Sequence, residues 1–516
     1  MVRSRVAVAA AVAALALALA LALALLASPV TAQAGPATLD YPGTGSCSTT
    51  LQACIDGANP GDTIRVVTNI RIDENVTITK SLTLTAGQGF HPVIGSATGT
   101  DSELVQDNQG SRVVVTFSNL TFRNARVTVF LAAQLNDRFT LVHSTIEHHA
   151  DNNNDYGVEV NAFALGATAT ILDNTIRTTG QPIELNTNLQ GDATTARLTA
   201  IGNRLSPSIP GDASNGIAVN LAGSGLPRID LLSNVLAHFA ACQCGDSGGI
   251  RIGTVGSVHA TLNVVGNTVD HTQDFNGGIL VLKPTQTSRF VLNTFDNVVT
   301  ASQGPGIALP PATPHSAVHA GFNDSFGNAM ADDYGGYAKG PGTVSIAPGY
   351  VNAGARNYRL KATSPLVDLG LTCDAGGLPR TDADGHFRIQ NRNVDMGAFE
   401  QGAGPVPAGK NVFGTAFHDT LAGTAGEDVI CGLDGPDTID GKGGADHVFG
   451  GEGADHVAGS AGADWVTGGP GPDVLSGGTG NDHVDAKDSS GGDSADGGPG
   501  HDLCLIDPGD HATNCP

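Results

Sequence analysis

An aspartate recurs every nine residues toward the end of this 516-residue chain. Calcium prefers hard anionic oxygens, and a carboxylate supplies them. The regular spacing therefore predicts a set of cation ligands in this part of the chain. The aspartates that recur in register are Asp419, Asp428, Asp437, Asp446, Asp455, Asp464, Asp473 and Asp482.

Each aspartate belongs to a nine-residue unit, and eight units follow one another from Phe413 to Val484. The glycines before the aspartate permit positive φ and let backbone carbonyls point inward. An apolar residue stands two places after the aspartate, where it would face the thin core of a short strand. A flexible acidic linker is the alternative interpretation, but a linker does not keep an apolar residue at a fixed offset.

The units resemble the RTX (hemolysin-type) calcium-binding nonapeptide, Gly-Gly-x-Gly-x-Asp-x-apolar-x. The resemblance implies a parallel β-roll in which two units make one turn and Ca2+ lies between loops stacked 18 residues apart. Alternate aspartates would then share one edge of the roll. The implied ligands are Asp428, Asp437, Asp446, Asp455, Asp464, Asp473, Asp482 and Asp502, with weaker ones at Asp419 and Asp493.

Four loops on each edge would leave three positions between loops, which amounts to about six ions. At about 1 mM calcium, a site with a dissociation constant of about 0.1 mM stabilises the fold by roughly 1.4 kcal/mol. Six such sites would contribute on the order of 8 kcal/mol, comparable to the stability of a whole domain. We therefore expect the segment to be largely disordered without calcium.

Several units depart from the pattern. The loop of Asp419 lacks the glycine pair, and Leu433 and Lys442 each replace a second glycine, so weaker or empty sites are expected there. The unit breaks at 485–495, and this step is expected to interrupt the stack before one terminal unit that holds Asp502. Three histidines follow their aspartates and are expected to face solvent on the strand rather than bind a transition metal: His447, His456 and His483.

Composition favours many short strands joined by tight turns. Glycine is frequent (70 residues), aromatic residues make up 5% and charged residues 15%, which does not suit helical bundles. The net charge is −24, and residues 411–516 hold nineteen Asp and Glu against two Lys, a net charge of −17. An acidic tail argues against nucleic acid as a partner and for cations.

The N-terminus has the form of a secretory signal. Arg3 and Arg5 precede an apolar run from Val6 to Ala27, and Ala32-Gln33-Ala34 is a small-x-small cleavage pattern. We predict a signal peptide at 1–34 and a secreted, extracellular protein with no stable membrane span after cleavage. An uncleaved anchor is the alternative, because the run is long enough to span a bilayer.

Eight cysteines fit an oxidising compartment. Two local disulfides are predicted, Cys47–Cys54 and Cys504–Cys515, because each pair flanks one short segment. The sequence leaves four cysteines without an assigned pairing. Two of them form a Cys-x-Cys pair that could ligate a metal, although a disulfide role is favoured: Cys242 and Cys244, with Cys373 and Cys431 as the other two.

Residues 35–400 carry a looser repeat of 25 to 33 residues, marked by a strand-like phrase that contains Asn. Short strands without helices at this period fit a right-handed parallel β-helix. Its asparagines are expected to stack as a ladder in tight turns. A helix at 48–58, with Thr49 and Gln52 as a capping pair, would close the end. The predicted ladder is Asn119, Ser144, Asn174, Asn203, Asn234, Asn267 and Asn297.

Two stretches, Asn357–Gly370 and Arg380–Glu400, resemble the choice-of-anchor Q proteins of the pectin-lyase-like β-helix superfamily. The resemblance implies an all-β fold and a surface or secreted context, and says little about activity. The expected organisation is a signal peptide at 1–34, a right-handed parallel β-helix at 35–400, a linker at 401–412 and the calcium-binding β-roll at 413–516.

Three functions remain open. Enzymes of that superfamily cleave acidic polysaccharides with clustered carboxylates and an Arg or Lys base, but no residues here form such a signature, and the catalytic residues are unknown. We expect a calcium-stabilised binding or surface module, with a polysaccharide lyase or glycosidase, or a calcium-dependent adhesin, as alternatives. Extracellular polysaccharide or a cell surface would be the partner. The candidate polar residues are His148, His149, Asp151, Asp155, Arg251, His271, Asp274, Asp332 and Asp333.

Overall fold

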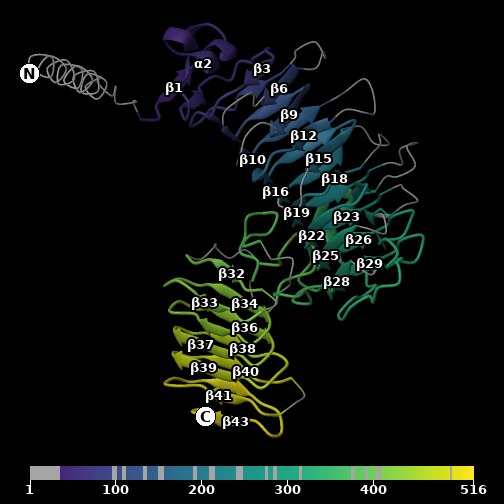
Figure 1. Cartoon of the computed structure of the whole chain (residues 1–516), viewed down its shortest axis with the longest axis vertical. Coiled ribbons are helices and arrows are strands. Elements are labelled where there is room, and N and C mark those ends of the chain that lie inside the picture. The colour runs from purple at the N-terminus through teal and green to yellow at the C-terminus, as the bar shows by residue number, and fades with distance from the viewer. Residues whose placement is uncertain are drawn as a thin grey trace, which may run out of the picture.

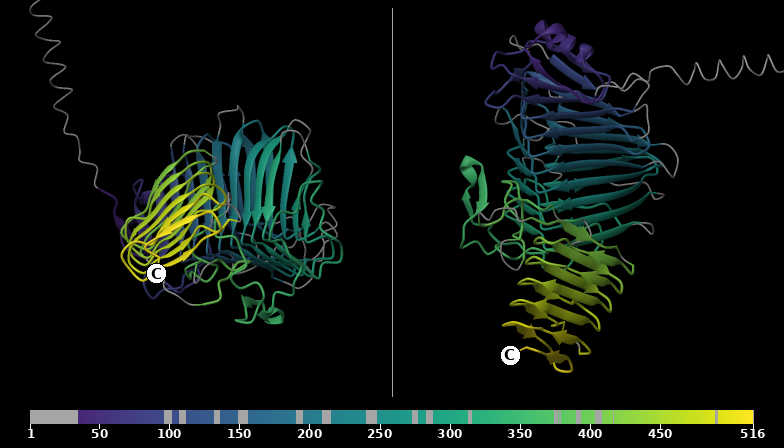
Figure 2. Two further views of the ribbon diagram at one scale, coloured as in Figure 1. Left: turned by 90° about the horizontal axis from the view of Figure 1, so that it is seen from below. Right: turned by 90° about the vertical axis from the view of Figure 1, so that its left-hand side faces the viewer.

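A computed structural model of the chain describes residues 35–95, 102–106, 112–131, 136–148, 156–189, 195–208, 215–239, 248–272, 277–282, 288–312, 316–373, 377, 379–389, 393–402, 408–415, 417–488 and 491–515. The predicted signal peptide and Cys242 and Cys244 lie outside these residues. The chain forms two stacks of parallel coils, and the second stack follows the first along the long axis (Figures 1 and 2).

The first stack is a three-sided parallel β-helix, so the predicted fold class is confirmed. Each complete coil gives one strand to each of three sheets, here called A, B and C. Sheet A consists of β1 (Thr38–Tyr41), β2 (Thr63–Val66), β4 (Leu82–Ala86), β7 (Val114–Ser118), β10 (Arg138–Val142), β13 (Ala167–Leu172), β16 (Thr195–Ile201), β19 (Leu226–Leu232), β22 (His259–Val265), β25 (Arg289–Phe295) and β28 (Ala317–Gly321).

The other two sheets have nine strands each, and their neighbours also pair in parallel. Sheet B consists of β5 (Val93–Ile94), β8 (Thr121–Arg123), β11 (Thr145–His148), β14 (Thr175–Thr178), β17 (Arg204–Pro207), β20 (Val235–Ala237), β23 (Thr268–Asp270), β26 (Val298–Thr300) and β29 (Asp324–Phe326). Sheet C consists of β3 (Val76–Ile78), β6 (Ser102–Gln106), β9 (Ala125–Leu131), β12 (Tyr156–Ala162), β15 (Gln181–Leu189), β18 (Ile217–Gly223), β21 (Ile250–Val255), β24 (Ile279–Val281) and β27 (Ile307–Ala308).

Apolar side chains fill the space between the three sheets. Alternate residues of a strand point to opposite faces, and the inward ones stack in rows because the strands are in register. One row of sheet C contains Val158, Ile183, Ile217 and Ile250, all fully buried. Neither a single coil nor a single row could bury this surface alone, so the coils stabilise one another.

The turn from sheet A to sheet B has the same two-residue form in successive coils. The first residue lies in the left-handed region, with φ between 49° and 64°. The second is a buried polar residue that bonds to the next coil. Asn234, for example, accepts from the backbone N–H of Asn203 (3.1 Å) and donates to Asn267 Oδ1 (3.1 Å) and to the carbonyl of Ala200 (2.8 Å). The ladder consists of Ser144, Asn174, Asn203, Asn234, Asn267, Asn297 and Asn323.

The predicted ladder is confirmed except at its first member. Asn119 is not in the ladder: it occupies the left-handed position of its turn (φ 57°), and Leu120 stands at the ladder position. Asparagine tolerates left-handed backbone, so the repeated phrase is displaced by one residue in this coil. The prediction also missed Asn323, which ends the ladder.

A short helix, α2 (Leu51–Gly57), closes the N-terminal end after the 3-10 turn η1 (Gly45–Ser48). Leu51, Cys54 and Ile55 enter the core, and the predicted Cys47–Cys54 disulfide is present. The predicted capping pair is wrong by one residue. Thr50 caps the helix by accepting from Ala53 N–H (3.0 Å). The carboxylate of Glu74 accepts the two other free N–H groups at the start of the helix, those of Leu51 and Gln52 (3.0 Å each).

Residues 346–402, here called the docking segment, leave the coils and cover the outer face of sheet B. The segment contains β30 (Tyr350–Asn352), η2 (Ala353–Ala355) and β31 (Asn357–Leu360). Its apolar side chains pack on outward residues of the sheet, such as Val235 and Val298.

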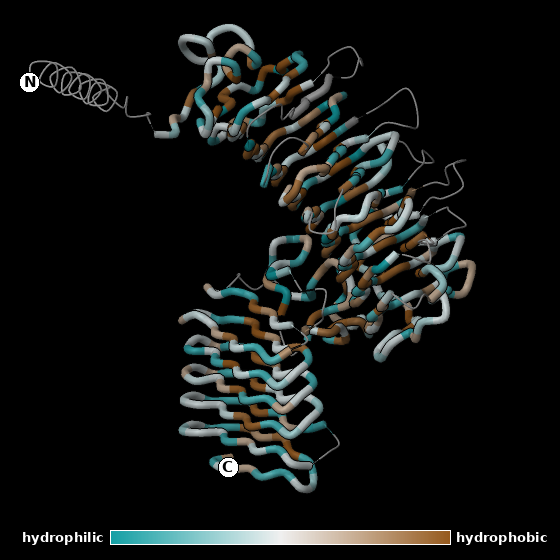
Figure 3. Tube along the Cα trace, viewed as in Figure 1, coloured by the Kyte–Doolittle hydropathy of each residue, from teal (hydrophilic) through white to brown (hydrophobic). Residues whose placement is uncertain are grey.

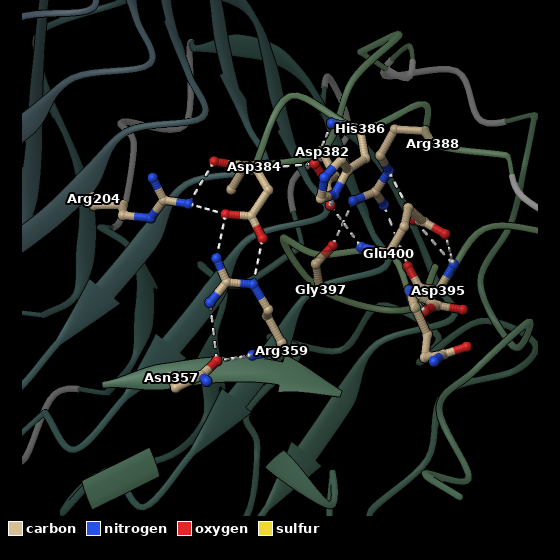
Figure 4. A network of polar contacts seen from close by, with 12 residues as sticks. Arg204, Asn357, Arg359, Asp382, Asp384, His386, Arg388, Asp395, Gly397 and Glu400 are labelled. Carbon is tan, nitrogen blue, oxygen red and sulfur yellow. Dashed lines mark hydrogen bonds and ion pairs between the residues drawn. The ribbon is translucent and has the colours of Figure 1, made fainter. Parts of the chain in front are cut away.

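A buried ion pair fixes the end of the docking segment (Figure 4). Arg388 Nε lies 3.2 Å from Glu400 Oε1, and both side chains are 1% exposed. Arg388 Nη1 also donates to the carbonyl of Gly397 (2.8 Å). Burial raises the pKa of Glu400 well above its usual range, although the Arg388 guanidinium opposes this.

The second stack is a two-sided roll, in agreement with the predicted β-roll. One sheet, here called D, consists of β32 (Asn411–Phe413), β34 (Val429–Asp434), β36 (His447–Glu452), β38 (Trp465–Thr467), β40 (His483–Asp485) and β42 (Leu503–Leu505). The other, sheet E, consists of β33 (Thr420–Ala422), β35 (Thr438–Asp440), β37 (His456–Ala461), β39 (Val474–Thr479), β41 (Ser494–Asp496) and β43 (His511–Thr513).

The core of the roll is one residue thick on each side. It is built from the apolar residue of each unit, including Val448, Val457, Val466 and Leu475. Figure 3 shows this core as a narrow apolar line between more hydrophilic loops.

The expected interruption of the stack at 485–495 is wrong. β39 pairs with β41, and β40 pairs with β42, both in parallel. The step between paired residues is 20 instead of 18, as in the pair Val474 and Ser494. A loop can take up two extra residues without changing the strands it joins, so the coils continue to the predicted Cys504–Cys515 disulfide at the end.

The docking segment joins the two stacks. Cys373 forms a disulfide with Cys431 of β34, a pairing that the sequence left open. Phe387, Ile389 and Val394 pack against β34 in one buried cluster around this disulfide. None of the helices in the described residues has the length and apolar character needed to span a bilayer.

We expect Asn234→Ala to lower the free energy of unfolding of the β-helix by at least about 3 kcal/mol. The change leaves the backbone N–H and one side-chain N–H of Asn203, and the carbonyl of Ala200, without this partner, and each costs about 1–3 kcal/mol. Urea unfolding followed by far-UV circular dichroism measures the effect. Thr168→Ala, on the outer face of sheet A, is the control and should change little; equal effects would contradict the structural role of the ladder.

Candidate metal-binding loops

The aspartates of the nine-residue units form two hydrogen-bonded ladders along the edges of the roll. In each ladder, the backbone N–H of one aspartate donates to Oδ1 of the aspartate in the next coil, at 2.7–2.9 Å. The structure therefore brings alternate aspartates together on each edge. One ladder is Asp419, Asp437, Asp455, Asp473 and Asp493, and the other is Asp428, Asp446, Asp464, Asp482 and Asp502.

The second oxygen of most of these carboxylates is buried without a donor. Among the described residues, Oδ2 of eight ladder aspartates is inaccessible and accepts no hydrogen bond. The side chains are at most 6% exposed. A buried anionic oxygen without a partner is costly, so a bound cation is the natural partner for it. The eight are Asp437, Asp446, Asp455, Asp464, Asp473, Asp482, Asp493 and Asp502.

Glycine leaves room beside each carboxylate. A methyl group on Gly450 would lie 2.5 Å from Asp455 Oδ2 and 2.6 Å from the carbonyl oxygen of Gly468 in the next coil. The same holds at Gly459, where the distances to Asp464 Oδ2 and the next carbonyl are 2.6 and 2.7 Å. Carboxylate and carbonyl oxygens of successive coils thus face a common space, and these are the donors that calcium prefers.

The electrostatics of the ladders also favour a cation. Burial raises the pKa of Asp446 to about 7, and the neighbouring carboxylates of Asp464 and Asp428 add to the effect. Burial likewise raises the pKa of Asp464 to about 6 and that of Asp473 to about 7. These groups carry charge reluctantly when alone, so a divalent ion between them would supply the missing positive charge.

The first aspartate of each ladder differs from the others. Thr424 donates through its backbone N–H and its hydroxyl to Asp428 Oδ2, and Thr415 does the same to Asp419 Oδ2 at 2.6 and 2.7 Å. Both carboxylates therefore already have donors on the side where the other eight have none. Asp493, placed with the weaker ligands in the sequence analysis, shares the environment of the eight.

The sequence pattern missed Asp510, which continues the first ladder. Its Oδ1 accepts from the N–H groups of Gly492 (3.0 Å) and Asp493 (3.2 Å), and its Oδ2 accepts from Asp507 (2.6 Å). The signal was the Gly509-Asp510 dipeptide eight residues after Asp502, outside the nine-residue frame.

Substitution of the second glycine leaves the loop conformation intact. Leu433 and Lys442 keep the positive φ of that position, at 79° each, and Ser460 has φ 80°. Oδ2 of Asp437 and of Asp446, in the units of Leu433 and Lys442, is buried as in the regular units. These non-glycine residues therefore keep a strained left-handed backbone, which the stacked neighbouring coils hold in place, and the loop does not change to a different conformation.

The three histidines lie in two environments. His456 is exposed on sheet E as expected. His447 is not exposed to solvent as predicted: it is half-buried and its Nδ1 is inaccessible, and this burial lowers its pKa to about 4. It precedes Trp465 and His483 in the outward row of sheet D, and the rings of these two stack at 3.8 Å.

Within the described residues, one group of His, Cys, Asp and Glu has ligand atoms that all lie within 4.8 Å of each other: Asp382, Asp384 and His386. Its carboxylate oxygens already have partners. Asp382 accepts backbone N–H groups, including that of Glu400 (3.0 Å), and Asp384 pairs with Arg204 and Arg359 (Figure 4). The group fastens the docking segment and does not resemble a cation site.

The candidate catalytic residues do not form one site. Arg251 lies on sheet C and donates to Asn220 Oδ1 (2.7 Å), whereas His271 follows β23 of sheet B and lies beside Asp270. They do not share a face as expected, because the two sheets face different directions. Asp332 accepts the backbone N–H of Ile307 in β27 (3.0 Å), Asp333 accepts that of Gly335 (2.9 Å), and His148 ends β11. The remaining candidates lie outside the described residues: His149, Asp151, Asp155 and Asp274.

A family model described as the RTX calcium-binding nonapeptide repeat matches residues 413–448, 432–466 and 458–490. These residues are RTX repeats. The match covers the ladders from Asp419 to Asp482. It ends before Asp493 and Asp502, although the coils and both ladders continue through these two residues.

The rest of the chain is compared through its fold. No curated protein matches the chain. A solved structure titled as pectate lyase Pel9A is 15% identical, covering 71% of this chain and 96% of its own, with a TM-score of 0.37. The resemblance to the choice-of-anchor Q proteins stays a prediction.

We expect Asp455→Asn to reduce the number of calcium ions bound by up to about two, the ions above and below this residue. The amide keeps Oδ1 as acceptor for Asp437 N–H (2.7 Å) and replaces only the unpartnered oxygen. Isothermal titration calorimetry with calcium measures the stoichiometry. Asp434→Asn is the control, because it removes the same charge from an exposed position outside the ladders. An equal loss in both variants would contradict the assignment.

Asp493→Asn should behave like Asp455→Asn, because Oδ2 of Asp493 is buried without a donor. Asp428→Asn should weaken the first coil, where Thr424 loses its acceptor, without changing the number of ions bound. The same titration separates the two variants. If Asp428→Asn lost ions and Asp493→Asn did not, the ions would lie at the start of the roll instead.

Proposed function

We propose that this chain is a secreted calcium-binding protein whose ions lie between the stacked RTX loops and hold the roll in shape. The observation that supports it is the buried, donorless Oδ2 of eight aspartates. Each edge carries four of them, in successive coils. Three positions between loops on each edge again amount to about six ions.

The ligands that we propose are Oδ2 of these eight aspartates and backbone carbonyls of the glycine loops. Asp428 and Asp419 would contribute less, since threonine donors occupy their second oxygen. The division into a signal peptide, a β-helix at 35–400, a linker at 401–412 and a roll at 413–516 belongs to the same proposal. Three disulfides fit an oxidising compartment, and the β-helix would serve as the binding or surface module.

Removing calcium should unfold the roll while the β-helix stays folded. Trp465 is the only tryptophan of the chain and stacks on His483 within the roll, so its fluorescence reports the roll alone. We expect EDTA to shift the emission of Trp465 to the red and to remove the roll's share of the far-UV strand signal. Excess calcium should restore both.

Magnesium is the control, because it dehydrates reluctantly and demands octahedral geometry. Recovery with magnesium alone would argue for non-specific charge screening. Emission and strand content that are unchanged in EDTA would overturn the proposed role of the ions.

A polysaccharide lyase or glycosidase is the second candidate, and the outer face of sheet C supports it. Glu159 and Glu184 are register neighbours there, and burial raises the pKa of Glu184. Asn220 donates to Glu184 Oε1 (2.7 Å) and accepts from Arg251 Nη1 (2.7 Å). Two carboxylates and an arginine thus lie along one row of adjacent strands.

This second function predicts depolymerisation of an acidic polysaccharide that Glu184→Gln abolishes. Size-exclusion chromatography of the glycan, with calcium present, is the measurement. Glu147→Gln, at a half-buried carboxylate on sheet B that pairs with Arg123, is the control. A wild-type chain that leaves a panel of acidic glycans intact would exclude the candidate.

A further inference from the structure

A hollow of about 270 Å3 lies between the outer face of sheet B and the docking segment. Strands β14, β17 and β20 form one side, and η2, β31 and Phe399 form the other. Segments about 150 residues apart in sequence therefore meet here, as in the contact between Arg356 and Ser206.

Four arginines line the hollow, and none of its described lining residues is acidic. This runs against the composition of the chain, which has 50 Asp and Glu against 26 Lys and Arg. Asp384, which is not a lining residue, pairs with Arg204 and Arg359 and neutralises one of the four charges. The arginines are Arg177, Arg204, Arg356 and Arg359.

Two of the arginines are held in place by the docking segment (Figure 4). Arg359 donates to both carboxylate oxygens of Asp384 through Nε and Nη2, at 2.5 and 2.6 Å, and Arg204 pairs with the same carboxylate. Both guanidinium groups also lie over the ring of Phe399, at 5.4 and 5.7 Å from its centre. Fixed guanidinium groups lose little freedom on binding a ligand.

The other two arginines keep most of their donors available. Arg356 uses Nη1 to donate to Ser206 Oγ (3.0 Å), and its backbone is held in the left-handed region (φ 57°) at the end of η2. Arg177 is exposed and is the register neighbour of Ser206 on one side and of Glu147 on the other. Glu147 forms its ion pair with Arg123, and Arg177 has no ion pair among the described residues. Hydroxyl groups of Thr175 and Ser206 lie on the same wall.

We propose that this hollow binds a small molecule through one oxyanion, a sulfate, phosphate or carboxylate group. Arg177 and Arg356 would hold the oxygens by charge-assisted hydrogen bonds, and Arg204 and Arg359 would strengthen the positive field. The volume is at the lower end for small-molecule sites, so the ligand is about the size of one sugar unit. The site is independent of the calcium ions of the roll.

Isothermal titration calorimetry of the full chain in saturating calcium tests the proposal with sulfate, glucuronate and neutral glucose as probes. We expect sulfate or glucuronate to bind and glucose not to bind. Arg177→Gln/Arg356→Gln should weaken binding by at least about tenfold, because it removes the free bidentate donors. Arg138→Gln/Arg289→Gln, on the outer face of sheet A, removes the same charge and should leave binding unchanged.

Arg177→Lys/Arg356→Lys keeps the positive charge and the fold but removes the two parallel donors of each guanidinium group. We expect this variant to lose an intermediate part of the binding affinity. Equal binding of sulfate and glucuronate would show that the oxyanion alone is recognised; tighter glucuronate would add the sugar ring. No binding of either anion by the wild-type chain, or equal losses in both glutamine variants, would overturn the proposal. The Trp465 response to calcium should be the same in every variant, so a failure here leaves the function of the roll untouched.

Discussion

Parallel stacking imposes one requirement on every coil: the polar groups in its turns must find partners in the next coil. Both stacks meet it with the same bond, a side-chain Oδ1 that accepts the backbone N–H of the preceding coil. In the β-helix the side chain is asparagine, whose Nδ2 donates to the next Oδ1, so the ladder satisfies itself. In the roll it is aspartate, whose second oxygen has no such donor among the described residues. The neutral ladder is complete, whereas the anionic one is short of positive charge.

This difference accounts for the distribution of charge along the chain. A self-satisfied asparagine ladder needs no ion and sits in a β-helix with a large apolar core. The roll has a core one residue thick, which contributes little hydrophobic stabilisation. The proposed calcium ions would supply there what apolar burial supplies in the first stack.

The nine-residue spacing, with the resemblance it carries, was sufficient to predict the roll and its 18-residue stacking, because these features are strictly periodic. Two of the disulfides could be predicted because each closes a short local segment. The ladder positions were predicted less well where an extra residue or loop shifts the repeat. Asn119 stands one residue away from the ladder, and Asp493 is in the ladder although two extra residues precede it. The Cys373–Cys431 disulfide and the arginine-lined hollow could not be predicted, since both depend on how the docking segment folds back across the coils. Nothing periodic in the sequence records that contact.

The docking segment also determines how the two stacks influence each other. It is pinned to sheet B by the buried pair of Arg388 and Glu400, and to the roll by Cys373. Order in the first coil of the roll is therefore shared with the end of the β-helix through covalent and apolar contacts.

The way the roll ends has a consequence for its length. Each interior coil touches only its two neighbours, so a coil could be gained or lost without redesigning the others. Such an array has no intrinsic last member, and its terminal strands β42 and β43 present open edges of the kind that promote end-to-end polymerisation. The Cys504–Cys515 disulfide ties β42 to the residues that follow β43. The covalent link thus holds both ends of the last described coil together, so this coil cannot fray from the stack as a free chain end would.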